Sequence, residues 1–165
     1  MPWNTPPTFT AGQVVTASDL NSYLRDNPNY LFGGPTTYTV KREGTADYTI
    51  TSTSFVDVDA TNLIITANVQ GGKFTVIAEF FMEPTGTSPQ CEADIILDST
   101  TRFGSTHGTA VFTPARWGHV TLVAFFTGLS AGSHTFKLQA RVTGASMTCT
   151  VYNNARPISM IGWGN

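Results

Sequence analysis

The stretch HTFKLQARVT, from His134 to Thr143, decides the fold class of this 165-residue chain. Apolar residues stand at every second position of the stretch, namely Phe136, Leu138, Ala140 and Val142. Successive side chains of a β-strand point to opposite faces of the sheet, so this alternation is typical of a strand with one dry face and one wet face. The stretch therefore predicts an antiparallel sheet that covers a core with one side.

The same period of two recurs over the whole chain beyond residue 35. Stretches rich in Gly, Pro, Ser and Asn separate the alternating segments, as in an all-β domain. We expect strands at 37–42, 47–51, 55–59, 62–68, 73–83, 91–98, 109–113, 119–127, 134–143, 147–153 and 157–163. Short strands at this spacing, with no helix among them, predict an antiparallel β-sandwich of jelly-roll type, with a small barrel as the alternative.

Two of these segments carry apolar side chains on both faces. Ile77 and Phe81 lie opposite the main apolar row of 73–83, and Val123 and Phe125 interrupt the polar face of 119–127. A strand that is apolar on both faces needs a second surface to bury it. We expect another copy of this chain to cover these residues, and the N-terminal arm or a long loop is the alternative cover.

The stretch TFTAGQVVTASDLNSYLRDN, Thr8 to Asn27, predicts one short helix ahead of the strands. Thr16 stands at the N-cap position, and Asp19 completes a capping box with Asp in the place of Glu or Gln. Pro28 cannot continue a helix, so the helix is expected to end near Asp26 or Asn27. A helix of about ten residues is unstable alone in water and must dock on another surface.

The apolar residues of this N-terminal region are the candidates for that docking. We expect attachment to use Trp3, Phe9, Val15, Leu20, Tyr23 and Leu24. A GGP sequence at 33–35 reads as a hinge after the helix. The sequence thus predicts two parts, an arm with a short helix at 1–34 and a β-module at 35–165.

The charge balance excludes several classes of partner. Only 12% of the residues are charged, and 9 basic residues against 11 acidic ones give a formal charge of -2. Neither nucleic acid nor an anionic membrane is expected to bind such a surface. The N-terminus has no signal-peptide pattern and no apolar run is long enough to cross a bilayer, so we expect a soluble cytoplasmic product. Cys91 and Cys149 are then expected to be buried free thiols, with a disulfide as the alternative.

The sequence offers little catalytic chemistry. The three histidines and two cysteines have no metal-binding spacing, and no cofactor motif is present, so neither a metal nor a cofactor is expected. Two pairs of carboxylates, Asp57 with Asp59 and Glu92 with Asp94, share strand faces. Paired carboxylates can hydrolyse glycosides, but an ordinary solvated strand face is the simpler interpretation.

One loop has the composition of a ligand site. The PARWGH stretch at 114–119 combines Arg116, Trp117 and His119, which offer a stacking surface and hydrogen-bond donors. Sugar-binding sites use such groups, although an edge Trp is more commonly a packing or oligomer contact.

The N-terminal pattern also resembles that of tailed-phage structural proteins of the tail-fibre, minor tail and head-attached kinds. The matching positions are Trp3, Gly12, Val15, Thr16, Ala17, Leu20, Asn21, Arg25, Asp26 and Asn27. The later stretch LSAGSHTFKLQARV, Leu129 to Val142, is similar to a strand-turn-strand segment of trimeric phage jelly rolls.

This resemblance implies a non-enzymatic virion protein. It would be made in the host cytoplasm and displayed on the particle surface as a homotrimer, as a capsid decoration, head fibre or tail fibre. Its arm would hold it to other virion proteins of the capsid or tail. The alternatives are a lectin-like receptor-binding module for host-surface glycan and, as a third reading, a polysaccharide depolymerase.

Overall fold

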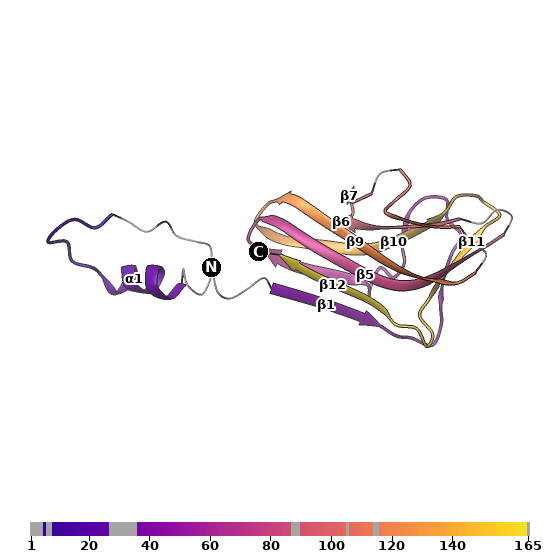
Figure 1. Ribbon diagram of the computed structural model, residues 1–165, viewed down its shortest axis with the longest axis horizontal. Helices are drawn as coiled ribbons and strands as arrows, with labels where there is room; N and C mark the ends of the chain where they lie inside the picture. Colours follow the sequence, from indigo (N-terminus) through magenta and orange to yellow (C-terminus); the bar gives the residue numbers. More distant parts are fainter. Residues whose placement is uncertain are drawn as a thin grey trace.

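The computed structural model describes residues 5, 8–26, 36–86, 90–104, 106–113 and 116–164. In this part of the chain two six-stranded antiparallel sheets pack face to face as a sandwich (Figure 1). The strands are β1 (Thr36–Arg42), β2 (Tyr48–Ile50), β3 (Val56–Asp57), β4 (Ile64–Val69), β5 (Gly72–Thr85), β6 (Cys91–Leu97), β7 (Thr101–Arg102), β8 (Ala110–Phe112), β9 (Gly118–Leu129), β10 (Gly132–Val142), β11 (Thr148–Tyr152) and β12 (Ile158–Gly164).

The first sheet, here called the β5 sheet, is organised by its longest strand. Strand β9 pairs with β5 along one side, from Gly72 to Met82. On the other side β5 pairs first with β12 and then with β11, and these two strands carry β1 and β2. A 14-residue strand can serve two partners in succession because it is about twice the usual strand length.

The second sheet, here called the β10 sheet, has the same plan. Strand β10 pairs with β4 and β3 on one side and with β6 on the other, and β6 carries β7 and β8. From β4 to β11 the chain repeatedly crosses between the two sheets, which is how a jelly roll is connected. The predicted fold class, an antiparallel sandwich of jelly-roll type with an arm and a short helix, is confirmed.

The core forms where the inner faces of the two sheets meet. The four alternating apolar residues of HTFKLQARVT are all fully buried, as are Phe74, Val76 and Phe80 of the facing strand β5. The rings of Phe74 and Phe136 stack across the core with centroids 4.4 Å apart. Alternation therefore assigns the inward face of both central strands correctly.

The two cysteines are not the free thiols that were expected from the sequence. Cys91 on β6 and Cys149 on β11 form a disulfide that joins the two sheets, where free thiols were expected. Both side chains point into the core, and their Cα atoms lie 5.6 Å apart, within the range that a disulfide spans. The expectation rested on the redox state of the cytoplasm, whereas the pairing follows from the packing of β6 against β11, which sequence spacing does not reveal.

The N-terminal helix is present but only its first turn is α-helical. Helix α1 covers Ala17–Leu20, and the chain continues as a π-helical turn, η1, over Asn21–Asp26. In Figure 1 α1 lies apart from the two sheets, and none of its residues is buried. The expected hinge at 33–35 and Pro28 lie outside the described residues.

Candidate attachment and binding surfaces

The start of the helix is fixed by reciprocal hydrogen bonds. The backbone N–H of Asp19 donates to the Thr16 hydroxyl at 3.2 Å, and the Thr16 N–H donates to the Asp19 carboxylate at 3.0 Å. These bonds hold the pKa of Asp19 below its usual value, first through the Thr16 hydroxyl. A capping box satisfies donors that a helix cannot pair internally, so these two residues set where the helix begins.

The apolar residues of the arm face solvent. Phe9, Val15 and Leu20 are each more than two-fifths exposed, Leu24 is 71% exposed, and Tyr23 is half-buried. Trp3, the remaining expected attachment residue, lies outside the described residues. The helix therefore carries apolar surface that the sandwich does not cover.

A second apolar surface lies on the outer face of the β5 sheet. The strand register places Ile161 of β12, Ile77 of β5 and Val123 of β9 in one row across three neighbouring strands. The next row brings Trp163 beside Thr75 and Phe125. We call these two rows the outer apolar face.

The exposure of the outer apolar face differs between its residues. Val123, Phe125 and Ile161 are 47%, 61% and 41% exposed, and Ile77 is half-buried between its neighbours. Phe125 keeps this exposure although its ring also contacts Phe103, with centroids 5.3 Å apart. Three of the four expected contact residues, Ile77, Val123 and Phe125, thus lie side by side, and Ile161 is an addition that the sequence analysis missed.

Phe81, the fourth expected contact residue, belongs to a different cluster. Its ring contacts Trp117 and His119, with centroid distances of 5.7 and 4.9 Å. The Arg156 guanidinium lies 3.9 Å from the centre of the Trp117 ring and 4.9 Å from that of Phe81. Tyr152, whose hydroxyl donates to Glu83, completes what we call the Trp117 cluster.

The Trp117 cluster gathers two of the three expected ligand residues. Trp117 is 53% exposed, and Arg116 is exposed on the same loop, of which residues 114 and 115 lie outside the described range. Arg156 was missed because it comes from the turn between β11 and β12, and only the register of β11 with β5 brings that turn close. An arginine stacked on an indole is a favourable cation–π arrangement.

The carboxylate pair on β6 is buried, although a solvated strand face was expected. Glu92 and Asp94 are fully buried, and Gly104, His107 and Thr109, from the stretch after β7, contact them. Asp94 accepts hydrogen bonds from the Gly104 N–H at 2.9 Å and the Thr109 hydroxyl at 2.8 Å. Glu92 pairs with Arg141 at 2.6 Å, so both carboxylates serve to hold neighbouring structure.

The other carboxylate pair is also engaged. Asp57 accepts from Lys137 at 2.9 Å and from Gln139 at 2.8 Å on the neighbouring strand. Asp59 accepts from Tyr48 and from the turn residues Thr61 and Asn62. Burial alone would raise the pKa of Asp59, but these hydrogen bonds outweigh it and hold that pKa well below its usual range. Asp59 therefore stays ionised, unlike a general acid, and both carboxylates already have hydrogen-bond partners.

Among the described residues, no three His, Cys, Asp or Glu side chains are grouped so that they could hold a metal ion. No helix in the same part of the chain is long and apolar enough to cross a membrane.

Comparisons with known proteins give distant likenesses. No protein-family model matches the chain, and no curated protein is similar to it. Among solved structures it is similar to that of the infectious bursal disease virus Gx strain, with 12% identity and a TM-score of 0.40 over 78% of this chain. The VP2 subviral particle of infectious bursal disease virus gives 13% identity and a TM-score of 0.39 over 79%. The chain spans 36% and 37% of the length of these two chains.

Proposed function

We propose that this chain is a non-enzymatic structural protein of a tailed-phage virion. It is displayed on the particle surface as a homotrimer, as a capsid decoration, head fibre or tail fibre, and it is attached to other virion proteins through residues 1–34. The β-module from residue 35 onward projects from the particle. The virion assignment comes from the resemblance of the N-terminal pattern, and the exposed apolar residues of the arm and the outer apolar face support attachment and self-association.

The arm carries the proposal. A capped helix with exposed Leu20 and Leu24 presents apolar surface that folding of the sandwich leaves uncovered. Full burial of one such side chain stabilises a contact by about 1.5–3 kcal/mol, whereas ordering each residue of the arm costs about 1–2 kcal/mol of backbone entropy. A single arm therefore binds weakly, and three arms on one trimer would bind together with much greater avidity.

The outer apolar face supports the trimer. Ile161, Ile77 and Val123 form a continuous row, and contiguous apolar surface on a soluble domain commonly marks a protein–protein contact. The residues of the two rows are uncharged, so identical subunits that meet there would bring no like charges of these rows together. Val123 and Phe125 remain 47% and 61% exposed in the described part of the chain, although Phe103 contacts the Phe125 ring.

A receptor-binding role is the second candidate, and the Trp117 cluster favours it. An exposed indole beside Arg156 and His119 has the stacking surface and donors of a site for neutral host-surface glycan. Binding to a glycan array that is lost on Trp117→Ala, with the thermal unfolding midpoint unchanged, would establish this role. A depolymerase would instead need chain cleavage that disappears when one of the engaged carboxylates is removed.

The experiment for the main proposal separates folding from attachment. Particles are assembled without the wild-type protein and supplied with either the full chain or a variant lacking residues 1–34. We expect the truncated chain to keep its unfolding midpoint and to be absent from purified particles. A truncated chain that decorates particles normally would refute attachment through the arm. Electron microscopy of decorated particles would then distinguish the capsid from the tail.

A further inference from the structure

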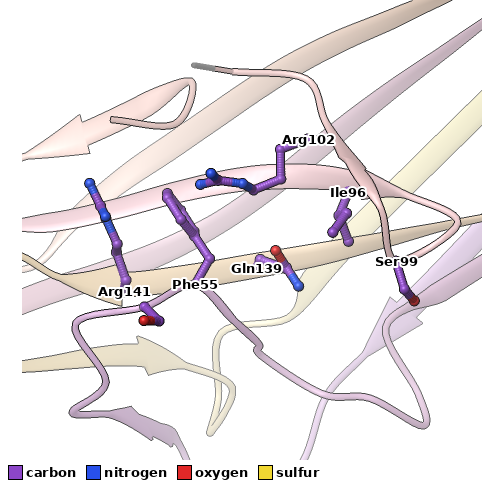
Figure 2. Close-up of a pocket in the computed structure, with 7 residues that line it drawn as sticks. Phe55, Ile96, Ser99, Arg102, Gln139 and Arg141 are labelled. Carbon is purple, nitrogen blue, oxygen red and sulfur yellow. The ribbon is translucent and has the colours of Figure 1, made fainter. Parts of the chain in front are cut away.

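The outer face of the β10 sheet carries a cavity of about 380 Å³ (Figure 2). Its lining includes the labelled side chains of Phe55, Ile96, Ser99, Arg102, Gln139 and Arg141. This volume is at the lower end of the range for small-molecule sites, about 300–1,000 Å³. The cavity faces away from the outer apolar face and the Trp117 cluster, which belong to the β5 sheet.

Phe55 positions two guanidinium groups at this cavity. Arg102 lies 4.3 Å and Arg141 lies 4.8 Å from the centre of the Phe55 ring, and Figure 2 shows the ring between them. Gly108, which lies before β8, passes close to this ring, because a Cβ at that residue would lie 2.9 Å from Phe55 and 2.8 Å from the Ala93 carbonyl oxygen. Gly108 also has a φ of +72°, which other residues rarely adopt.

Arg141 has its charge balanced. It bonds to the buried Glu92 carboxylate at 2.6 Å and to the Thr106 carbonyl oxygen at 2.7 Å. Glu92 also contacts His107 at 3.2 Å. Arg141 is therefore held in place as part of the wall of the cavity.

The charge of Arg102, in contrast, has no carboxylate partner among the described residues. Its Nη1 atom is buried without a hydrogen-bond partner, and no carboxylate of the described residues lies within 4 Å of its guanidinium. The two other carboxylates of this face are already engaged, Asp94 by Gly104 and Thr109, and Asp57 by Lys137. Arg102 thus lines the cavity without a carboxylate partner, and an anion in the cavity would supply the counter-charge that the described residues do not.

We propose that this cavity binds a sugar that carries a carboxylate, such as a hexuronate. The planar fork of an arginine matches a carboxylate in geometry and charge, which accounts for the anionic group. The hydroxyls of Ser54 and Ser99 lie at the same cavity and have no hydrogen-bond partner among the described residues, so they can accept and donate to sugar hydroxyls. This binding is independent of attachment through the arm.

The test is a titration of the full chain followed by amide NMR. The probes are sodium glucuronate, glucose and sodium acetate at low ionic strength. We expect saturable shifts at residues 54–55, 96–102 and 139–141 with glucuronate, much weaker ones with acetate and none with glucose. The affinity should fall as sodium chloride is added, because the contact is between charges.

Three variants make the result specific. Arg102→Gln should weaken glucuronate binding by about tenfold or more, since a charged hydrogen bond is lost, and Arg102→Lys should recover part of it. Lys73→Gln is the control, because it removes an exposed positive charge from β5 on the opposite sheet and should leave the affinity unchanged. Absence of saturable shifts at the cavity, or equal affinity of Arg102→Gln and wild type, would overturn the site. Equal binding of acetate and glucuronate would overturn its assignment to a sugar.

Discussion

The imidazole of His134 and the carboxylate of Asp98 meet with 2.7 Å between Nδ1 and Oδ2. The other ring nitrogen of His134 lies 3.1 Å from the carbonyl oxygen of Ser130, which can only accept. Both ring nitrogens therefore face acceptors, an arrangement that favours the protonated imidazolium. Asp98 also accepts from the Thr135 N–H at 2.8 Å, so the pair fastens the turn after β6 to the start of β10.

This pair predicts a dependence of stability on pH. The pKa of His134 is raised above 6.5, first by its hydrogen bond to Asp98 and then by the Ser130 carbonyl. Burial opposes the change at Asp98, but bonds from Thr135 and His134 lower its pKa below 3.8. The stabilisation from His134 is thus complete below pH 6.5 and lost as pH rises through its folded-state pKa. That from Asp98 is present above pH 3.8 and lost as pH falls through its own folded-state pKa.

The measurement compares wild type with His134→Gln by thermal unfolding across this range. We expect the wild-type advantage in unfolding midpoint to be greatest between pH 3.8 and 6.5 and to shrink on the alkaline side. Salt should reduce the advantage only in part, because the imidazole is nearly buried while the carboxylate is partly exposed. A midpoint difference that does not vary with pH would contradict an ion pair.

The disulfide between Cys91 and Cys149 should contribute strongly to stability. It closes a loop with a sequence separation of 58, for which the chain-entropy argument gives about 4 kcal/mol. We expect the double variant Cys91→Ala, Cys149→Ala to unfold at lower denaturant concentration by about 2–5 kcal/mol. Thiol titration of unreduced, denatured wild type should find no reactive thiol, and finding two would show that the bond does not form in the protein.

Asp94 should be needed to hold the loop above it. Replacing it by Ala leaves the Gly104 N–H and the Thr109 hydroxyl without the charged acceptor of two partly buried hydrogen bonds. We expect a loss of about 1–3 kcal/mol in unfolding free energy and faster hydrogen exchange at residues 104–109. Protection equal to wild type at those amides would show that the loop is held by other contacts.

Alternation predicted the sandwich well because it reports the one property that strands such as β5 and β10 share, a buried face. All eleven expected strands occur, and only the two-residue strand β7 was missed, since Thr101 and Arg102 are too short a stretch to show a period. The start of the helix was equally predictable, because the two residues of a capping box are only three positions apart in the sequence.

Features that depend on tertiary contacts could not be predicted from the sequence in the same way. Glu92 and Asp94 alternate with apolar residues as solvated side chains do, yet the segment after β7 covers them. The pairing of Cys91 with Cys149 and the approach of Arg156 to Trp117 both require knowing which strands face or adjoin each other. Sequence spacing carries no signal for such contacts.

The outer apolar face should determine self-association. Val123→Lys places a charge in the middle of the proposed contact, beside the apolar side chains of Ile77 and Phe125, and burying a charge in an apolar contact is unfavourable. We expect wild type to be a trimer and the variant a monomer by light scattering at micromolar concentration, with similar unfolding of the subunit itself.

Val111 provides the matched control for this substitution. It is a valine on strand β8 of the other sheet with the same exposure as Val123, 47%. Val111→Lys should remain trimeric. A monomeric wild type would exclude the trimer directly, and dissociation by both substitutions would mean that added charge acts without regard to position.

The last prediction concerns Leu24, the most exposed of the expected attachment residues in the described part of the arm. Because Leu24 is 71% exposed and no residue of α1 is buried, Leu24→Asp should leave the unfolding midpoint of the sandwich unchanged. It should nevertheless prevent incorporation into particles, since a carboxylate would have to be buried where the helix meets its partner. Thr16→Ala removes the cap and should reduce occupancy less, at a cost of about 0.5–2 kcal/mol per helix. Unfolding midpoints are measured beside particle occupancy for both variants. A large fall in the midpoint of Leu24→Asp would place the helix against the domain core and contradict its role as a separate attachment element.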